Sequence, residues 1–493
     1  MPPVTSSART YVARAYRDTP VPGPLERHMM NRMGCGFSSA TLTRMRAAGG
    51  ARAWFEQQLT PSSVPQAAKV ADLDTWFPSL AESMETKYRN SEAKRKLGWE
   101  YGVEFGNWSM LRRIFSTRSV YENMVDLWSN HFHVSAYTGH SWVPRKGYDS
   151  TIRAHALGRF EDLLIGVSLH PAMLLYLDNF RSTVGAPNEN QGRELLELHT
   201  VGRDSGYSED MVKSSAVILS GWTVYDKTTF ERYYNPAAHT TGRVRVLDFT
   251  HENATPDGSA VATAYLSYLA RHPATARTVA RKLAVRFVSD TPSEALIDRL
   301  AQVFLDSDTD IKSVLRALVD SPEFAASADA KVRTPVDDLV ATARALRVNP
   351  SRPVHAGAFA RDMSHIHGGD RLYDWPRPDG SPQTNAEWCS ASRMLNSYRM
   401  HWGMAGGFYP KVDVVYRPRP AWMPKKRMRF DVYVDHLCRV LLGRRSTALL
   451  LQAACEATRL PPTEVVTKTH PVSTFLFPRL VGALLDSPAH MTR

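Results

Sequence analysis

Apolar residues recur every three or four positions along most of this 493-residue chain, which is the spacing of amphipathic α-helices. Serines precede several of these stretches and Gly or Pro follows them, as helix caps and stops require. The predicted helices lie at 38–48, 91–118, 120–131, 152–169, 171–180, 188–201, 208–219, 275–288, 292–305, 311–319, 335–346 and 386–401. Three more are expected after residue 430.

The character of the chain changes between residues 222 and 249, where Tyr, Thr and Val become frequent. Apolar and polar side chains alternate at 230–234 and 243–249, and the pairs Asn235-Pro236 and Thr241-Gly242 are typical of turns. We therefore predict a mainly α fold: a multi-helix globular protein with a small β insertion around 222–249.

The length exceeds what one hydrophobic core usually fills, so two packed units, or one large unit with insertions, are expected. An N-terminal arm is expected at 1–25, followed by a main helical domain at 26–350 that carries the β insertion. A loop-rich region with one helix is expected at 351–430. The C-terminal helices at 431–493 are expected to pack on the main domain.

Composition excludes several classes of protein. No stretch approaches the ~20 apolar residues that a membrane-spanning helix needs. Residues 1–24 contain Arg9, Arg14 and Arg17 and no apolar core, so we expect no secretory signal and a cytoplasmic protein. The four cysteines match no zinc or redox spacing, which predicts reduced thiols. Phosphate-binding Gly-rich loops, Gly-x-Ser-x-Gly elbows and His-Glu-x-x-His motifs do not occur.

The formal net charge is +12, and one segment concentrates it. Its basic residues are Arg417, Arg419, Lys425, Lys426, Arg427 and Arg429. Tyr416, Trp422 and Phe430 stand among them, and this combination can bind single-stranded nucleic acid. Three prolines predict an irregular loop, however, so we favour a solvated loop that braces the C-terminal helices. Polyanion binding through 417–429 is a weaker alternative, and nucleic acid is not an expected partner.

Two histidines in the segment 128–134 have a spacing that suits metal ligands. The predicted helix ends near His131, and in an extended chain beyond it His131 and His133 point the same way. Neutral imidazole is the commonest nitrogen ligand of metals, so both rings could reach one ion. The alternative is that one histidine caps the helix while the other packs in the core.

A second candidate lies on the predicted helix at 188–201. At 100° per residue, Asn190, Glu194 and Glu197 fall on one stripe, with Arg193 beside it. Leucines cover much of the remaining surface, which predicts a buried helix. Buried carboxylates must be paired, protonated or bound to a cation, so the two glutamates are candidates for acid/base work or metal ligation. A structural network with nearby arginines is the alternative.

Two further polar segments carry weaker signals. The first is 248–253 with Asp257, whose residues fit an exposed turn as well as a site. The second holds His365 and His367 before two glycines, in a loop that could act as a lid. For both segments we favour the turn or loop interpretation over a functional one.

Seven motifs carry a resemblance to a known family. They are a helix ending in Gly-Phe at 28–37, Trp-x-Asn-His-Phe at 128–132, Pro-Ala-Met-Leu-x-Tyr-Leu-Asp at 171–178, Asn-Glu-Asn-x-x-Arg-Glu-Leu-Leu-Glu-Leu-His-Thr at 188–200, Leu-x-Gly-Trp at 219–222, His-Pro-x-Thr-Ala-Arg at 272–277 and Ser-Pro-Glu-Phe at 321–324. In this order they resemble the bacterial DUF1800 family, a domain of unknown function, over nearly the whole chain.

The resemblance implies no established reaction. It implies a sulfatase-like partner protein of the DUF1501 family, because members are often encoded beside one. It also implies export signals in many members, and this chain departs from that pattern. In the middle loop, His251-Glu252 stands where the family often has His-Asp followed by Lys, which weakens a catalytic role for that loop.

The leading hypothesis is an enzyme whose metal or acid/base site is formed by the segments around His131 and Glu194. The expected catalytic residues are Asn190, Arg193, Glu194 and Glu197, and the expected ligands of a divalent transition metal are His131, His133, Glu194 and Glu197. The main alternative is a non-catalytic helical scaffold that binds the sulfatase-like partner. Convergence of these residues on a pocket favours the enzyme, and a sealed core favours the scaffold.

Overall fold

Helices follow one another along almost the whole chain, as the apolar spacing predicts. The computed structural model describes residues 11–350, 362, 366 and 371–493. Up to the β insertion the α-helices are α1 (Pro24–Arg32), α2 (Ser39–Ala47), α3 (Ala51–Gln58), α4 (Ala68–Trp76), α5 (Met84–Glu92), α6 (Gly98–Phe115), α7 (Ser119–His131), α8 (Arg145–His155), α9 (Phe160–Ser168), α10 (Pro171–Tyr176), α11 (Glu189–Glu194) and α12 (Glu209–Leu219). After it they are α13 (Ser259–Ala270), α14 (Pro273–Phe287), α15 (Glu294–Asp306), α16 (Ile311–Val319), α17 (Pro322–Ala326), α18 (Pro335–Ala345), α20 (Ala391–Gly406), α21 (Phe430–Leu442), α22 (Ala448–Thr458), α23 (Phe477–Leu485) and α24 (Pro488–Met491). The mainly α class is confirmed.

The strands in the described ranges are short and form two-stranded antiparallel sheets. They are β1 (Trp222–Val224), β2 (Arg232–Tyr234), β3 (Val244–Val246), β4 (Phe249–His251), β5 (Asn349–Pro350), β6 (Val414–Val415), β7 (Arg427–Arg429) and β8 (Val465–Thr467). β1 pairs with β2 and β3 with β4, which confirms the small β insertion. The pairs β5–β6 and β7–β8 join segments far apart in the sequence, and no local pattern predicts them.

Local chemistry sets many of the helix boundaries. The Ser38 hydroxyl accepts a hydrogen bond from the Thr41 amide at the start of α2, and Gly49 follows the end of that helix with φ 98°. The prediction of one helix at 91–118 is wrong. The chain takes a positive φ of 54° at Lys94, so α5 and α6 are separate helices.

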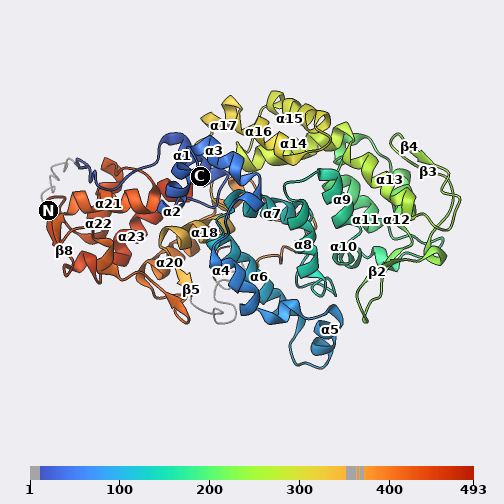
Figure 1. Cartoon of the computed structure of the whole chain (residues 1–493), viewed down its shortest axis with the longest axis horizontal. Helices are drawn as coiled ribbons and strands as arrows, with labels where there is room; N and C mark the ends of the chain where they lie inside the picture. The colour runs from blue at the N-terminus through green and yellow to red at the C-terminus, as the bar shows by residue number, and fades with distance from the viewer. Residues whose placement is uncertain (1–10, 351–361, 363–365, 367–370) are drawn as a thin grey trace, which may run out of the picture.

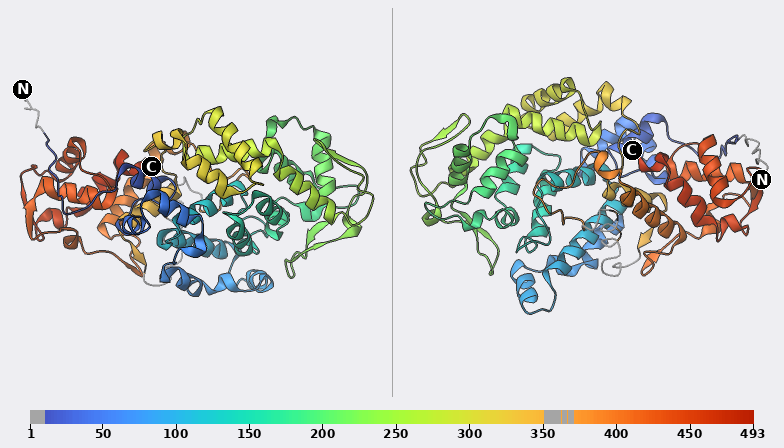
Figure 2. Two further views of the ribbon diagram at one scale, coloured as in Figure 1. Left: turned by 45° about the horizontal axis from the view of Figure 1, so that its top comes forward. Right: turned by 180° about the vertical axis from the view of Figure 1, so that it is seen from behind.

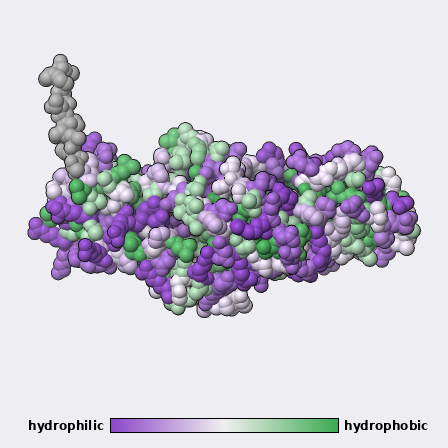
Figure 3. All heavy atoms as spheres, turned by 90° about the horizontal axis from the view of Figure 1, so that it is seen from above, coloured by the Kyte–Doolittle hydropathy of each residue, from purple (hydrophilic) through white to green (hydrophobic). Residues whose placement is uncertain are grey.

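The molecule is elongated. In Figure 1 the helices α21–α23 lie at one end and the strands β3 and β4 at the other, with α6, α7 and α18 between them. The view from behind keeps this order (Figure 2). Hydrophilic residues cover most of the face seen from above (Figure 3). Of the helices that the structure describes, none has both the length and the apolar character needed to cross a bilayer.

Two large apolar clusters fill the interior. One gathers side chains mainly from α1–α3, α7–α9 and α12–α16. The other gathers them mainly from α4, α6, α18 and α20–α23. The division of the chain at residues 25, 350 and 430 stays a prediction.

The helix α18 is buried along its entire length, although it carries two adjacent aspartates. The first, Asp337, lies 3.2 Å from Arg113 on α6, 3.1 Å from Arg286 on α14 and 3.2 Å from Arg493 at the C-terminus. Burial raises the pKa of Asp337, but the three guanidinium groups outweigh it and hold this pKa well below its ordinary value. The carboxylate therefore fixes where α6, α14 and the C-terminus meet.

We predict that Asp337→Asn lowers the free energy of unfolding by about 3–5 kcal/mol, because it leaves buried guanidinium groups without a counter-charge. Chemical denaturation followed by circular dichroism measures the change. As a control, Asp210→Asn removes an exposed carboxylate 3.1 Å from Lys213 and should change stability by less than about 1 kcal/mol. Equal effects of the two substitutions would contradict the structural role of Asp337.

Candidate functional site

The segment 128–133 divides its polar side chains between the core and a loop. His131 ends α7, and its ring is buried against Phe160 and His199. Its Nε2 atom lies 3.1 Å from the carbonyl oxygen of His199. Burial and the charge of Lys282 hold the pKa of His131 well below its ordinary value, so the ring is neutral. The structure thus places His131 in an aromatic core.

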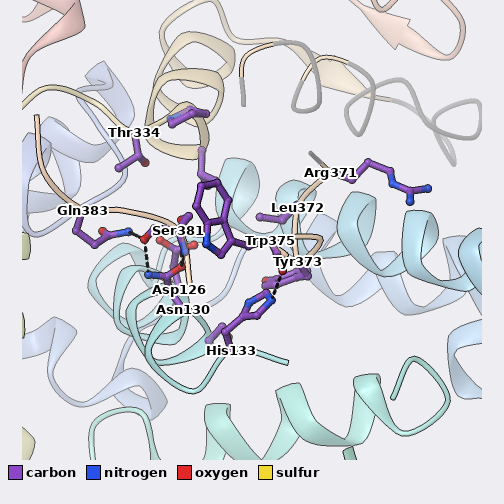
Figure 4. A pocket seen from close by; sticks show the side chains of 13 residues that line it. Asp126, Asn130, His133, Thr334, Arg371, Leu372, Tyr373, Trp375, Ser381 and Gln383 are labelled. Carbon is purple, nitrogen blue, oxygen red and sulfur yellow. Dashed lines mark hydrogen bonds between the residues drawn. The ribbon is translucent and has the colours of Figure 1, made fainter. Parts of the chain in front are cut away.

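Asn130 and His133 face the loop at 371–385 instead. The side chain of Asn130 accepts a hydrogen bond from the amide of Ser381 at 2.7 Å and donates one to its carbonyl oxygen at 2.9 Å. The Nε2 atom of His133 lies 3.0 Å from the carbonyl oxygen of Trp375. A pocket of about 40 Å³ remains between α7 and this loop (Figure 4). It has room for a few water molecules only.

The helix α11 does not continue as an α-helix. It passes into a π-helical turn, η4 (Leu195–His199). A π-helix has more residues per turn than an α-helix, so Glu197 is rotated out of the stripe that 100° per residue predicts for Asn190 and Glu194. The structural consequence is that the two glutamates have different surroundings.

The residues flanking Glu194 on this helix are exposed or engaged in ion pairs. Asn190 is exposed. Arg193 lies 2.6 Å from the carboxylate of Glu209. Glu197 lies 2.9 Å from Arg203. Their expected catalytic roles stay predictions.

Glu194 itself has different contacts. It is half-buried, and within the described ranges its carboxylate has no hydrogen-bond or ion-pair partner. Burial and the negative charges of Glu197 and Asp379 raise its pKa, against the attraction of Arg203 and Arg193. An ionised Glu194 is therefore poorly compensated.

Lys282 on α14 is, like Glu194, a poorly compensated charge. It is half-buried, and it has no hydrogen-bond or ion-pair partner among the residues that the structure describes. Burial lowers its pKa to about 8, although the charge of Asp379 acts in the opposite direction. Asp379 belongs to the loop and accepts a hydrogen bond from Trp375 at 3.3 Å. Burial and the charges of Glu194 and Asp379 raise the pKa of Tyr176 to about 12.

Sequence reasoning missed Lys282, Asp379 and Tyr176. Lys282 and Asp379 lie far along the chain from Glu194, and Lys282 stands in a helix of ordinary amphipathic pattern. Tyr176 ends the preceding α-helix, α10. The one local signal is Gly380, which has φ 73°. A Cβ atom there would collide with the carbonyl oxygen of Asn130, so this glycine allows the loop to approach α7.

The other sequence candidates do not join this group. His251 and Glu252 are exposed, and Glu252 pairs with Arg243 at 3.5 Å on the surface. His365 and His367 lie outside the described residues. The segment 248–253 contains the strand β4, with His251 and Glu252 on the surface and Asn253 buried beside His239.

The basic segment 417–429 binds to the rest of the protein. Arg419 donates to carbonyl oxygens of α20 and of the segment before α23, at 2.5 and 3.2 Å. Arg417 lies 4.6 Å from the centroid of the Trp422 ring. Arg429 pairs at 2.7 Å with a carboxylate at the start of α21. These contacts brace the C-terminal helices.

One group in the described chain brings three metal-ligating atoms within 4.8 Å of one another: Asp338, His401 and His490, all buried. They come from α18, α20 and α24. The Nε2 atoms of His401 and His490 lie 2.9 and 3.7 Å from the same carboxylate oxygen of Asp338. Asp486 lies 2.7 Å from the other ring nitrogen of His401, as carboxylates do behind metal-bound histidines.

The charges of this group balance without a metal ion. Burial lowers the pKa of His401, but Asp338 and Asp486 outweigh it and raise this pKa to about 9, so the ring is protonated at neutral pH. Arg393 lies 3.5 Å from Asp338, and two cations thus offset two carboxylates. A divalent ion would displace the proton and leave excess positive charge in a buried site, which is costly. The geometry favours an ion network over a metal centre.

The fold and these sites define a mainly helical protein in which two half-buried charges, Glu194 and Lys282, each interact with the carboxylate of Asp379. The family model described as protein of unknown function (DUF1800) matches residues 28–492. The chain therefore belongs to the DUF1800 family, which confirms the resemblance seen in its motifs. No curated protein and no solved structure matches the chain.

We predict that His401 is an imidazolium ion at pH 7.5 and titrates near pH 9. The folded pKa exceeds the ordinary value of 6.5. The stability that this ring contributes is therefore complete below about pH 6.5 and is lost as pH rises through about 9. Carbon-13 NMR of histidine-labelled protein measures the titration, and His401→Gln assigns the signal. Asp486→Asn should lower the pKa, and a neutral ring at pH 7.5 would contradict the network.

Proposed function

We propose that this protein is an enzyme that transfers protons at a site formed by Glu194 and Lys282 beside Asp379. One observation supports the proposal. Glu194 and Lys282 are half-buried, carry opposite charges and have no described hydrogen-bond or ion-pair partner, and the carboxylate of Asp379 influences the pKa of both. Their pKa values are displaced toward each other, upward for Glu194 and downward to about 8 for Lys282. General acid–base catalysis uses groups whose pKa values are shifted from their ordinary values toward neutral pH.

The charges assign a role to each group. At neutral pH the carboxylate of Glu194 accepts a proton, because its raised pKa makes it a stronger base than an exposed glutamate. The ammonium group of Lys282 donates one, because its lowered pKa makes it a stronger acid than an exposed lysine. The substrate accordingly loses a proton near Glu194 and develops negative charge near Lys282, which stabilises that charge.

The surrounding residues support these two groups. Glu197 helps to raise the pKa of Glu194. Through Trp375, His133 holds the loop that carries Asp379. The proposal uses acid–base chemistry rather than a metal at His131, His133, Glu194 and Glu197. In the described ranges, no three of those four residues bring ligand atoms within 4.8 Å of one another.

We predict that Glu194→Gln leaves the free energy of unfolding at pH 7 unchanged or increases it. A raised pKa means that the ionised side chain disfavours folding, so removing the charge removes a cost. Thermal and chemical denaturation measure this effect. As a control, Glu56→Gln breaks an exposed ion pair of 3.0 Å with Arg316 and should cost at most about 1 kcal/mol. A loss of about 3–5 kcal/mol in Glu194→Gln would indicate a structural ion network instead.

Turnover tests the enzyme directly. The wild-type protein is incubated with an extract of polar small molecules, and mass spectrometry identifies the compounds that it consumes. We expect Glu194→Gln and Lys282→Met to abolish this consumption and the exposed control Lys213→Met to retain it. If the wild-type protein consumes nothing, the proposal fails and the scaffold that binds a sulfatase-like partner takes its place.

We predict that the amine of Lys282 becomes reactive near pH 8. The exposed Lys213, which is paired with Asp210, has a pKa above its ordinary value and should react only at higher pH. Competitive acetylation across a pH series, read by mass spectrometry, compares the two amines in one sample. Asp379→Asn should lower the midpoint of Lys282 further, because that carboxylate raises the pKa. An unchanged or higher midpoint in the variant would separate Asp379 from the site.

A further inference from the structure

A second polar site lies away from Glu194, between the start of α2, the end of α6 and the end of α18. A pocket of about 660 Å³ opens there. Among the residues that the structure describes, three arginines line it, namely Arg44, Arg344 and Arg347, and no acidic residue does. At Asp337 the guanidinium groups are neutralised by a carboxylate, whereas the described lining of this pocket provides none.

Two of these arginines converge on one hydroxyl group. Arg44 and Arg344 donate hydrogen bonds to the Oγ1 atom of Thr41, at 3.2 and 3.1 Å. Neither forms an ion pair with any carboxylate that the structure describes. Burial and the neighbouring charge of Arg344 lower the pKa of Arg44, which is the signature of like charges held together.

Arg344 has a structural reason for its position. One of its nitrogens donates to the carbonyl oxygens of Arg113, Ile114 and Ser116, at 3.2, 2.9 and 3.3 Å. It thus caps the C-terminus of α6. Within the described ranges Arg44 and Arg347 have no comparable backbone contacts, and both are exposed, so their charges are available to a ligand.

The rest of the lining favours a ligand that has both an anionic and an apolar part. The N-terminus of α2 contributes Ser39 and Ala40 to the lining, and amide groups at a helix start favour anions. Ile114, Val348 and Val440 add an apolar surface. The lining of the pocket therefore combines positive charge with apolar side chains.

We propose that this pocket binds the phosphate group of a phosphate monoester that also carries an apolar portion. The available guanidinium groups of Arg44 and Arg347 offer two positive charges. A phosphate monoester supplies two negative charges and three acceptor oxygens, whereas a carboxylate supplies one charge and two oxygens. The apolar wall contacts the remainder of the molecule. The site is independent of the one at Glu194 and Lys282.

Calorimetry at low ionic strength tests the site, with inorganic phosphate and hexyl phosphate as probes. We expect one hexyl phosphate per chain, bound at least tenfold more tightly than inorganic phosphate. Arg44→Gln and Arg347→Gln should each weaken binding at least tenfold, because each removes a positive charge that contacts the phosphate. Both side chains are exposed, so the fold should stay intact. The control Arg245→Gln removes an exposed charge of the strand β3, at the far end of the molecule (Figure 1), and should leave binding unchanged.

Three outcomes overturn the proposal. The first is the absence of heat and of thermal stabilisation with either phosphate at low salt. The second is equal loss of binding in Arg245→Gln, which would indicate attraction to net charge alone. The third is hexanoate binding as tightly as hexyl phosphate. Flotation with vesicles that contain phosphatidic acid then identifies the source: flotation that Arg44→Gln abolishes indicates a lipid headgroup, and its absence indicates a soluble ester.

Discussion

The rest of this structure depends on one constraint: two adjacent buried aspartates on α18 must each pair with positively charged groups of other elements. A carboxylate removed from water must find cations, and Asp337 and Asp338 find them on different elements. Asp337 binds groups of α6, α14 and the C-terminus, whereas Asp338 binds His401 of α20. One short helix therefore joins elements from both apolar clusters. Hydrophobic burial supplies most of the driving force, but these pairs specify which helices meet.

The same network reaches the proposed catalytic site through the loop at 371–385. Arg286, a partner of Asp337, also donates to the side chain of Gln383 at 2.8 Å. Asn130 at the end of α7 holds Ser381 by two hydrogen bonds. The loop is thus fixed at several points next to Asp379, and this carboxylate is held where it influences both Glu194 and Lys282. A site assembled from distant segments needs such rigid support if its charges are to keep their positions.

Local pattern predicts the parts of this protein that local physics determines. The 3.6-residue periodicity predicts most of the helices and the alternation predicts β2 and β3, because both depend on neighbours in the sequence. The same reasoning singles out Glu194 as a carboxylate on a largely apolar helix. It cannot supply Lys282 or Asp379, because only tertiary packing brings Asp379 near both Glu194 and Lys282. It also misses the π-helical turn that separates Glu197 from the stripe, since a stripe calculation assumes a regular helix.

The partners of a buried or half-buried charge distinguish structural from functional groups in this protein. The charges of Asp337, Asp338 and His401 are neutralised by other groups of the protein. Removing one of them leaves its partners as buried charges without a counter-charge, which lowers the free energy of unfolding. Glu194 and Lys282 have no such partners in the described chain, and Arg44 lies beside another arginine. Such arrangements cost stability, and a strained or destabilised active site is one place where a protein accepts that cost. Neutralising a charge at α18 is therefore expected to lower stability. Under our two proposals, neutralising Glu194, Lys282 or Arg44 is expected to remove chemistry or binding without loss of stability.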